Sequence, residues 1–442
     1  MKRTQIQLKN GQNLEGFIIG FRPDLGDEYL VFWGHQEKPE KIYLSDIESC
    51  ITYGVQVQAD CYQDIDELER ARKHGWNPKT RLSTSGTQCV KIQVGNDVKL
   101  YSRNYKYTFN VINGESNRWG AEKEDDPQWC VYGPEIADIE ISTICHGINN
   151  KSCEFCYKSN TAKGTNMSLE TFEKVLDKIN TAVLTQIAFG IGDIDANPDL
   201  WGIFKHCREN KIIPNVTING DRMTSEYYDN LAELCGAVAV SRYNPSDICY
   251  NAVKELTDRN MQQVNIHMVL SQESYEDCLK LIDDACTDPR LENLNAIVFL
   301  ALKEKGRGKS MHSLRDTEKY KYLVEKAFKQ NVAIGFDSCS APIFLKSMEN
   351  NSNYKLFSQL SEPCESTLFS IYVDVKGNIW PCSFLENEEY EPINLLEIDD
   401  FIKECWHSEK LDKFREDLIN TTKSANCLVA GCRECPKYNL YR

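Results

Sequence analysis

The feature that most constrains this chain is a group of three cysteines on one loop, Cys145, Cys153 and Cys156. Residues 139–144 before them largely alternate apolar and polar side chains, which predicts a β-strand that ends at the first cysteine. Three thiolates can hold three irons of a cubane [4Fe–4S] cluster, because soft sulfur ligands suit iron–sulfur centres. No fourth cysteine lies nearby in the sequence, so one iron would stay open for a substrate or cosubstrate. A zinc site and three unrelated thiols are the competing interpretations.

A three-cysteine loop of this kind, with an aromatic residue (Phe155) before the last cysteine, resembles the radical S-adenosylmethionine superfamily. The resemblance implies that the open iron chelates S-adenosylmethionine. An electron from the cluster would then cleave it to methionine and a 5′-deoxyadenosyl radical. The usual spacing in that superfamily is C-x3-C-x2-C, whereas this chain has C-x7-C-x2-C. A longer first spacer can still bring three sulfurs together, but it leaves the loop conformation undetermined.

The segment downstream carries a second part of the resemblance. Residues 186–200 predict a strand, a glycine loop and a helix entry, and they are similar to the superfamily's second-strand motif. Gly192 and Asp193 fall where that motif has its second glycine and its acid, while Ile191 replaces the first glycine. Glycine lets backbone carbonyls approach a ligand, and a carboxylate can accept a hydrogen bond from an α-amino group. The alternative is an ordinary strand-to-helix turn.

Polar residues at the ends of two further apolar runs complete the predicted wall for S-adenosylmethionine. Asn219, Ser241 and Arg242 lie where the superfamily places polar contacts to the cosubstrate. Ligands gather at the carboxyl ends of parallel strands. We therefore expect these three residues to share one site with Gly192 and Asp193. We assign no catalytic residue from the sequence.

Four more cysteines, near the C-terminus, have the spacing of metal ligands: Cys364, Cys382, Cys432 and Cys435. The first two flank a predicted hairpin with its turn at residues 376–378, and the last two form a C-x2-C pair. Four thiolates complete the ligand set of a second iron–sulfur cluster. The arrangement resembles the twitch, or truncated SPASM, domain that many radical enzymes carry after the barrel. A structural zinc site is the alternative. Cys339 and Cys427 are left over, either as spare thiols or with one of them exchanging into this ligand set.

Strands alternate with amphipathic helical segments through the middle of the chain, which predicts a parallel sheet with right-handed crossovers. We expect the α/β class, with a partial (β/α)6 TIM-like barrel over residues 132–335. A small β-barrel-like domain (1–60) and a mixed β and linker region (61–131) would precede it. A twitch- or SPASM-like auxiliary cluster domain would follow over residues 336–442.

Composition agrees with a cluster-binding protein. Nineteen cysteines, with no recognisable signal peptide, indicate a reducing cytoplasm in which disulfides are rare. The formal net charge of −15 at pH 7 disfavours nucleic-acid binding, which depends on neutralising phosphates. The sequence also lacks an apolar run long enough to span a membrane, so we expect no membrane partner.

The resemblance implies a radical S-adenosylmethionine enzyme that abstracts hydrogen from a substrate C–H bond, with a peptide or protein as the leading substrate class. Its cofactors would be S-adenosylmethionine, one cluster that binds it, and one auxiliary cluster. An electron donor such as flavodoxin or ferredoxin would reduce the enzyme. Dehydrogenation of a small-molecule alcohol through the auxiliary cluster is one alternative. A non-catalytic Fe–S or zinc binding protein on the same scaffold is the other.

Three further features receive a structural interpretation. His146 is expected to face solvent on its loop, with tuning of the cluster by hydrogen bonding as the alternative. His267 is expected to be a core histidine or to point inward from mid-strand. The basic run at residues 303–309 (KEKGRGK) lacks the Walker pattern, so we expect a solvated loop at a strand end.

Overall fold

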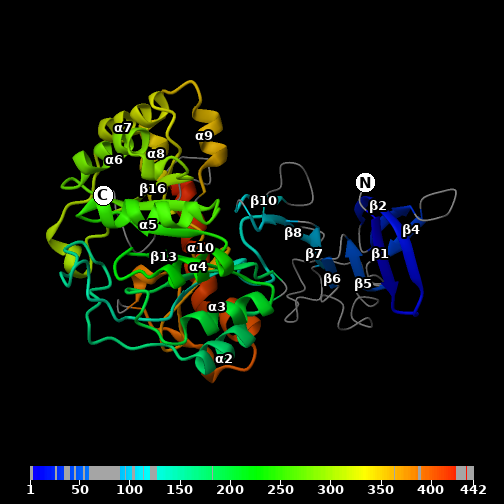
Figure 1. The fold of residues 1–442 in the computed structure, drawn as a ribbon. Coiled ribbons are helices and arrows are strands. Elements are labelled where there is room, and N and C mark those ends of the chain that lie inside the picture. Colours follow the sequence, from blue (N-terminus) through cyan, green and yellow to red (C-terminus); the bar gives the residue numbers. More distant parts are fainter. Residues whose placement is uncertain are drawn as a thin grey trace. The chain divides into compact units, whose positions relative to one another are not determined.

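The computed structural model of the chain describes residues 3–24, 27–33, 40–43, 46–52, 55–58, 90–94, 96–101, 105–112, 114–119, 127–181, 183–362, 364–386, 390–424 and 435. The chain divides into two compact units (Figure 1). The first comprises Met1–Glu135, Asp177–Thr185 and Asp399–Trp406. The second comprises Ile136–Leu176, Gln186–Ile398 and His407–Arg442. The domain limits expected at residues 60, 131 and 335 stay predictions.

The first unit contains a ten-stranded antiparallel sheet in the order β10-β9-β8-β7-β6-β5-β1-β2-β3-β4. The strands before residue 60 and those after it belong to one sheet, because β6 and β7 pair at Gln58 and Lys91. Alternate residues of β8 and β9, such as Leu100 and Tyr107, are buried on one face. The strands are β1 (Arg3–Leu8), β2 (Asn13–Asp24), β3 (Asp27–Trp33), β4 (Glu40–Tyr43), β5 (Ile47–Thr52), β6 (Val55–Gln58), β7 (Val90–Val94), β8 (Asp97–Tyr101), β9 (Lys106–Asn110) and β10 (Ser116–Trp119).

The second unit is built on a second ten-stranded sheet, in the order β17-β16-β15-β14-β13-β12-β11-β18-β19-β20. Neighbours from β11 to β17 pair in parallel, in the order of the sequence. These strands are β11 (Ile136–Glu140), β12 (Gln186–Gly190), β13 (Ile213–Ile218), β14 (Val238–Ser241), β15 (Val264–Leu270), β16 (Ala296–Ala301) and β17 (Ile334–Phe336). The connecting helices are α2 (Leu169–Ile179), α3 (Leu200–Glu209), α4 (Ser225–Leu234), α5 (Ser246–Asp258), α6 (Tyr275–Thr287) and α7 (Thr317–Lys329).

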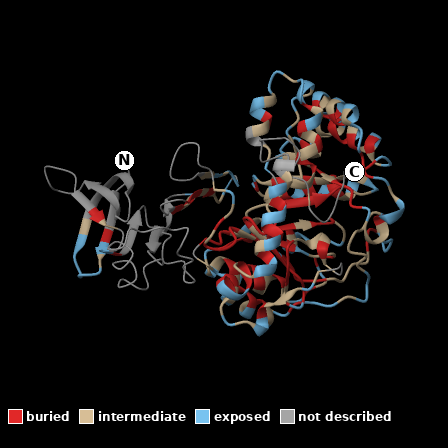
Figure 2. Cartoon of the chain, turned by 180° about the vertical axis from the view of Figure 1, so that it is seen from behind, coloured by how far each residue is buried: buried red, intermediate tan, exposed pale blue. Residues whose placement is uncertain are grey.

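Helices cover one face of this parallel sheet, and the other face is more open. Phe172 of α2 and Phe204 of α3 pack on Phe189 of β12, with ring centroids 5.7 and 5.0 Å apart. Buried and half-buried residues alternate along β13, β15 and β16, as expected when only one face lies beneath helices. Figure 2 shows the buried strands in red and the exposed outer surfaces of the helices in pale blue. Thr217 and His267 lie on the half-buried face.

A hairpin extends the sheet next to the first barrel strand. β18 (Ser370–Val373) pairs in parallel with β11 and antiparallel with β19 (Asn378–Trp380), and β20 (Ile393–Asn394) follows. The Asp374 carboxylate organises the turn: it accepts hydrogen bonds from the backbone N–H of Asn378 (3.0 Å) and from Trp380 Nε1 (3.1 Å). Gly377 has φ +81°, which favours glycine. The predicted hairpin is therefore present, and its first strand, β18, lies next to β11.

The expected α/β class with a partial TIM-like barrel is confirmed, with β17 as a short seventh parallel strand. Helices α8 (Ala341–Ser347), α9 (Tyr354–Leu360) and α10 (Glu409–Ser424) belong to the same unit. No helix of the described residues is both long and apolar enough to cross a membrane.

The buried side chain of Asn197 joins three segments at the carboxyl end of the sheet, so we expect Asn197→Ala to destabilise this unit. Its Nδ2 donates to the carbonyls of Ile141 (2.8 Å) and Met167 (2.9 Å). The Ile141 carbonyl would keep its hydrogen bond from the backbone N–H of Met167 (3.0 Å), whereas the Met167 carbonyl would lose the Asn197 donor. Loss of a buried hydrogen bond of this kind costs about 2 kcal/mol in the free energy of unfolding. Anaerobic urea denaturation measures the change. Asn293→Ala, at an exposed position, is the control and should leave the transition within about 0.5 kcal/mol of wild type.

Candidate functional site

The three-cysteine loop begins where β11 ends, and its long first spacer folds back on itself. Ile148 and Lys151 exchange two backbone hydrogen bonds of 3.1 and 2.9 Å, forming an antiparallel bridge within the spacer. Gly147 has φ +74°, and a Cβ there would lie 2.0 Å from the Lys151 carbonyl oxygen. The additional residues of the C-x7-C spacing therefore form a tight turn, which leads the chain back towards Cys145 before Cys153.

The three thiols share one half-buried environment. Burial, together with the charges of Cys145 and Cys156, raises the pKa of Cys153 to about 11. Burial also raises the pKa of Cys145, with Asp193 and Cys156 as additional causes. The turn in the spacer and these effects on Cys145 and Cys153 indicate that the three thiols surround one space, where a single cluster could contact all three. The residues thus fit the three corner ligands that the sequence predicts for a [4Fe–4S] cluster.

The basic run at residues 303–309 lies directly against this loop. The backbone N–H of Arg307 donates to the Cys156 carbonyl (3.0 Å), and its Nε donates to the Cys153 carbonyl (2.9 Å). Its Nη1 donates to the Asn160 carbonyl (3.1 Å). Gly306 has φ +59°, and a Cβ there would lie 2.3 Å from the Tyr157 carbonyl oxygen. We call Gly306 and Arg307 the loop clamp, because they hold the backbone around the second and third cysteines.

The expectation of a solvated strand-end loop was therefore wrong for this clamp. A run rich in lysine and arginine predicts exposure, because charged groups are costly to bury. Here Arg307 satisfies its donors with backbone carbonyls, and the small glycine allows two chain segments to touch. Of Lys303, Gly306, Arg307 and Lys309, only Lys309 is exposed.

The predicted wall residues Gly192, Asp193 and Asn219 meet at the first cysteine. A Cβ on Gly192 would lie 2.5 Å from the Cys145 Cβ, so the glycine turn packs on the loop. The Asp193 carboxylate accepts from the backbone N–H of His146 (2.8 Å), and Asn219 Nδ2 donates to the Gly192 carbonyl (3.0 Å). Asp193 also lies 2.7 Å from His146 Nδ1 and forms an ion pair of 2.8 Å with Arg222 Nη2.

Sequence reasoning missed Arg222, and it favoured a solvent-facing His146 over one that forms hydrogen bonds at the site. The His146 side chain is 38% exposed, but both its backbone and its ring contact Asp193. Arg222 follows the end of β13 by four residues and has φ +56°. The sequence could have indicated Arg222 by its position just after the Asn-Gly strand end, because ligand-binding residues gather at the carboxyl ends of parallel strands.

Ser241 and Arg242 lie at the end of β14. The residue after them, Tyr243, contacts the three-cysteine loop. The Tyr243 ring packs on Phe155, with centroids 5.2 Å apart. The Arg242 side chain is buried and lies over the Tyr250 ring. Its Nε has no hydrogen-bond partner among the described residues, so a buried donor is available at this wall. An unpaired buried donor is costly, which favours a ligand that accepts from it.

His267 points to the half-buried face of the sheet, where its Nδ1 lies 3.4 Å from Thr217 Oγ1. Burial lowers the pKa of His267 to about 4, and the distant Asp337 only partly opposes this. The side chain is therefore neutral at pH 7. Of the two interpretations we considered for His267, the structure supports the inward-facing one.

The second cysteine group gathers around the hairpin. Burial raises the pKa of Cys364 well above its ordinary value, and the charges of Cys339, Cys382 and Cys435 add to the effect. Burial raises the pKa of Cys382 to about 12, with Cys339 and Cys435 as further causes. Three of the four predicted ligands thus share one environment. Cys432, the fourth, and Cys427 lie outside the described residues.

Cys339, which had no partner set in the sequence, joins this group. It lies in a 3-10 turn (Ser338–Ser340) directly after β17. The buried Lys303 ammonium forms an ion pair with Asp337, and Lys303 also lowers the pKa of Cys339, which burial raises to about 11. Its position at a strand end was a usable signal, but its distance of 25 residues from Cys364 hid the spatial link.

Among the described residues, no three Cys, His, Asp or Glu side chains lie close enough together to hold one metal ion. A cubane cluster is bound at separate corners, so its thiolates lie further apart than the ligands of one ion. The two cysteine groups fit iron–sulfur clusters because the thiols within each group share one environment.

Comparison with known proteins identifies the C-terminal region. Residues 364–436 match the model of the SPASM iron-sulfur cluster-binding domain. No curated protein matches the chain significantly in sequence.

Solved structures share the fold of most of the chain. Streptococcus suis SuiB bound to the precursor peptide SuiA has a TM-score of 0.60 at 14% identity, over 79% of this chain and 98% of that chain. SuiB bound to S-adenosylmethionine has a TM-score of 0.54 at 16% identity, over 70% and 76%. Native anSMEcpe with bound AdoMet and the Cp18Cys peptide has a TM-score of 0.50 at 15% identity, over 69% and 89%.

These findings confirm the resemblance that the cysteine loop indicated. The chain shares the fold of these solved structures, and residues 364–436 match a SPASM iron–sulfur cluster-binding domain. This match to a domain that binds iron–sulfur clusters confirms the expected iron–sulfur cofactor.

The loop clamp predicts that Gly306→Ala will weaken cluster binding. A Cβ would lie 2.3 Å from the Tyr157 carbonyl oxygen and 2.7 Å from that of Cys156, at a backbone angle that disfavours side chains. We expect the reconstituted variant to lose most of the roughly four irons of one cubane cluster. Iron and sulfide analysis of anaerobically reconstituted protein measures this.

Gly335→Ala on β17 is the matched control, since the nearest atom to its Cβ would be Val298 Cγ2 at 4.0 Å. It should keep the wild-type iron content. Equal iron in both variants would show that the clamp does not support the cluster.

Proposed function

We propose that this chain reductively cleaves S-adenosylmethionine and uses the resulting radical to abstract hydrogen from a C–H bond of a peptide or protein. The observation that carries the proposal is the contact between the three-cysteine loop and the Gly192–Asp193 turn at the carboxyl ends of the first barrel strands. This is where ligands bind in parallel α/β folds. The proposed reaction requires a one-electron donor, such as flavodoxin or ferredoxin, and the cytoplasm remains the predicted location.

A [4Fe–4S] cluster bound by Cys145, Cys153 and Cys156 would supply the electron for cleavage and an open iron for the cosubstrate. The protein residues would orient the cosubstrate. Asp193 already holds the backbone N–H of His146 and the Arg222 guanidinium, so a cationic α-amino group would compete with Arg222 for this carboxylate. The unpaired Nε of Arg242 would donate to an acceptor such as a carboxylate. Asn219 and Ser241 would complete this wall.

The peptide substrate class rests on the fold comparisons. SuiB carries a precursor peptide and anSMEcpe carries the Cp18Cys peptide on folds that cover most of this chain. The half-buried inner face around Thr217 and His267 offers neutral polar groups towards the barrel interior. The dehydrogenation of a small alcohol rests on cysteine spacing alone, so peptide modification is the better supported reaction.

We assign Cys364, Cys382, Cys432 and Cys435 to the auxiliary cluster, with Cys339 as a fifth thiol at the same place. The two cysteine loops touch: the Tyr157 ring lies 4.5 Å from the Phe384 ring, and Tyr157 Oη donates to Ser383 Oγ (3.2 Å). Tyr157 directly follows Cys156, and Ser383 directly follows Cys382. An auxiliary cluster here would therefore be placed to accept an electron from a product radical.

The first test replaces Cys145, Cys153 and Cys156 together by alanine. The variant should lose about four irons per chain and all reductive cleavage of S-adenosylmethionine. Formation of 5′-deoxyadenosine with dithionite under anaerobic conditions measures the activity. The control replaces three other thiols, Cys249 on α5 with Cys278 and Cys286 on α6. Cleavage by the first variant, or no cleavage by wild type, would disprove the proposed function.

The second test concerns the auxiliary site. The intact protein should hold about eight irons, and the variant with Cys364, Cys382, Cys432 and Cys435 changed to alanine should hold about half of them. That variant should still cleave S-adenosylmethionine in the absence of substrate, because its first cluster is intact. Mössbauer spectroscopy with iron and zinc analysis decides the metal. Stoichiometric zinc, with iron for one cluster only, would rule out an auxiliary electron acceptor, since zinc has no redox chemistry.

A further inference from the structure

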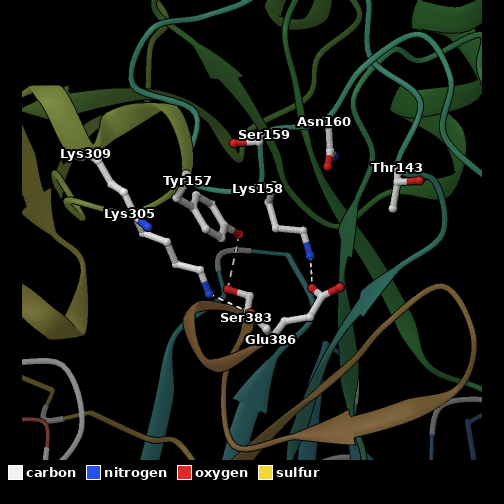
Figure 3. Close-up of a pocket in the computed structure, with 10 residues that line it drawn as sticks. Thr143, Tyr157, Lys158, Ser159, Asn160, Lys305, Lys309, Ser383 and Glu386 are labelled. Atoms are coloured by element: carbon white, nitrogen blue, oxygen red, sulfur yellow. Dashed lines mark hydrogen bonds and ion pairs between the residues drawn. The ribbon is translucent and has the colours of Figure 1, made fainter. Parts of the chain in front are cut away.

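A polar pocket of about 350 Å³ opens beside the two cysteine loops (Figure 3). One wall is residues 157–160, which directly follow Cys156. A second wall is Ser383 and Glu386, which follow Cys382. Lys305 and Lys309, from the basic run, form the third. The pocket is therefore built from the chain that immediately follows a ligand of each proposed cluster.

The walls are held in place before any ligand binds. Lys158 Nζ donates to Tyr372 Oη (2.7 Å) and forms ion pairs with Glu140 (3.0 Å) and Glu386. Lys305 Nζ donates to the backbone carbonyls of Phe384 and Glu386, each at 2.6 Å. Figure 3 shows the amines of Lys158 and Lys305 extending to the Ser383–Glu386 loop. A preformed pocket loses little conformational entropy when it binds, which favours a specific ligand.

The charge of this pocket is opposite to that of the whole chain. Three lysines and one glutamate line it, in a protein whose formal net charge is −15. Lys158 is committed to two carboxylates. Lys309 is exposed and makes no ion pair within the part of the chain that the structure describes. The adjacent Arg307 directs its described hydrogen bonds to carbonyl groups, which do not neutralise its charge.

We propose that this pocket binds a carboxylate of the peptide substrate and so anchors it next to both cluster loops. The proposal rests on the peptide-modifying function proposed above and specifies a carboxylate, from an acidic side chain or a chain end, as the group of the substrate that is bound. The ammonium of Lys309 would pair with the carboxylate, and the hydroxyl of Ser159 and amide of Asn160 line the same space. The volume is at the small end of ligand pockets, which suits one side chain or a chain end better than a large cofactor.

The test uses anaerobically reconstituted holoenzyme and three fluorescein-labelled glycine-rich hexapeptides. The first has two central glutamates and an amidated C-terminus, and the second has glutamines in their place. The third has the glutamines and a free C-terminal carboxylate. Fluorescence anisotropy at physiological salt should show the first or the third binding at least tenfold more tightly than the second. The tighter of these two identifies an acidic side chain or a chain end as the source of the carboxylate.

Lys309→Glu should reduce binding of the preferred acidic peptide at least tenfold and leave the glutamine peptide unchanged. Lys329→Glu, an exposed lysine on α7, is the matched control for overall charge and should change neither. Equal binding of all peptides, no binding of any up to 1 mM, or an equal loss in both variants would overturn the proposal. So would an effect of Lys309→Glu confined to reduction by an acidic flavodoxin, which would indicate a donor docking surface instead.

This experiment is separate from the test of the function itself. Formation of 5′-deoxyadenosine by wild type without substrate reports whether the chain cleaves S-adenosylmethionine. Peptide discrimination reports only on the pocket. A protein that cleaves the cosubstrate but binds all three peptides equally would keep the proposed function and lose the acidic subsite.

Discussion

Close backbone contact around the three-cysteine loop is the constraint on which the rest of the site depends. Glycines occupy three points of close backbone contact: Gly147, where the spacer folds on itself, and Gly192 from the β12 turn and Gly306 from the clamp, where other segments meet the loop. A Cβ at any of them would lie 2.5 Å or less from a neighbouring atom. The loop is therefore fixed by packed backbone, so the thiols are arranged before a cluster binds.

Charge reinforces this packing from both sides of the loop. Arg307 holds the carbonyls of Cys153 and Asn160, while Asp193 holds the backbone N–H of His146. Hydrogen bonds that involve an ionised group are stronger than neutral ones. Both ionised groups are themselves positioned by strand ends, after β16 and β12. Because the strand ends of the parallel sheet lie together, residues that are far apart in the sequence support the same loop.

The proposed auxiliary site connects elements that lie apart in the order of the sheet. Cys339 follows β17 at one edge, whereas Cys364 and Cys382 flank the hairpin strands that extend the sheet beyond β11. Their thiols nevertheless feel one another's charge. The Tyr157 contact with Phe384 links this region to the first cysteine loop, and the Lys303 ammonium lies 4.7 Å from the centroid of the same Phe384 ring. One aromatic residue therefore joins the surroundings of both cysteine groups.

The sequence by itself determined the fold class, the two cysteine groups, the hairpin and the glycine–aspartate turn. Each of these can be recognised from the spacing or periodicity of residues that lie near one another in the sequence. It could not determine that Arg307, Arg222 and Cys339 contact these groups, since each lies far along the chain from its partners. It also misjudged residues 303–309. A run of charged residues predicts exposure, but here backbone carbonyls accept hydrogen bonds from the charged side chain of Arg307. Only the tertiary structure decided these contacts: parallel strands bring their carboxyl ends together regardless of separation in sequence.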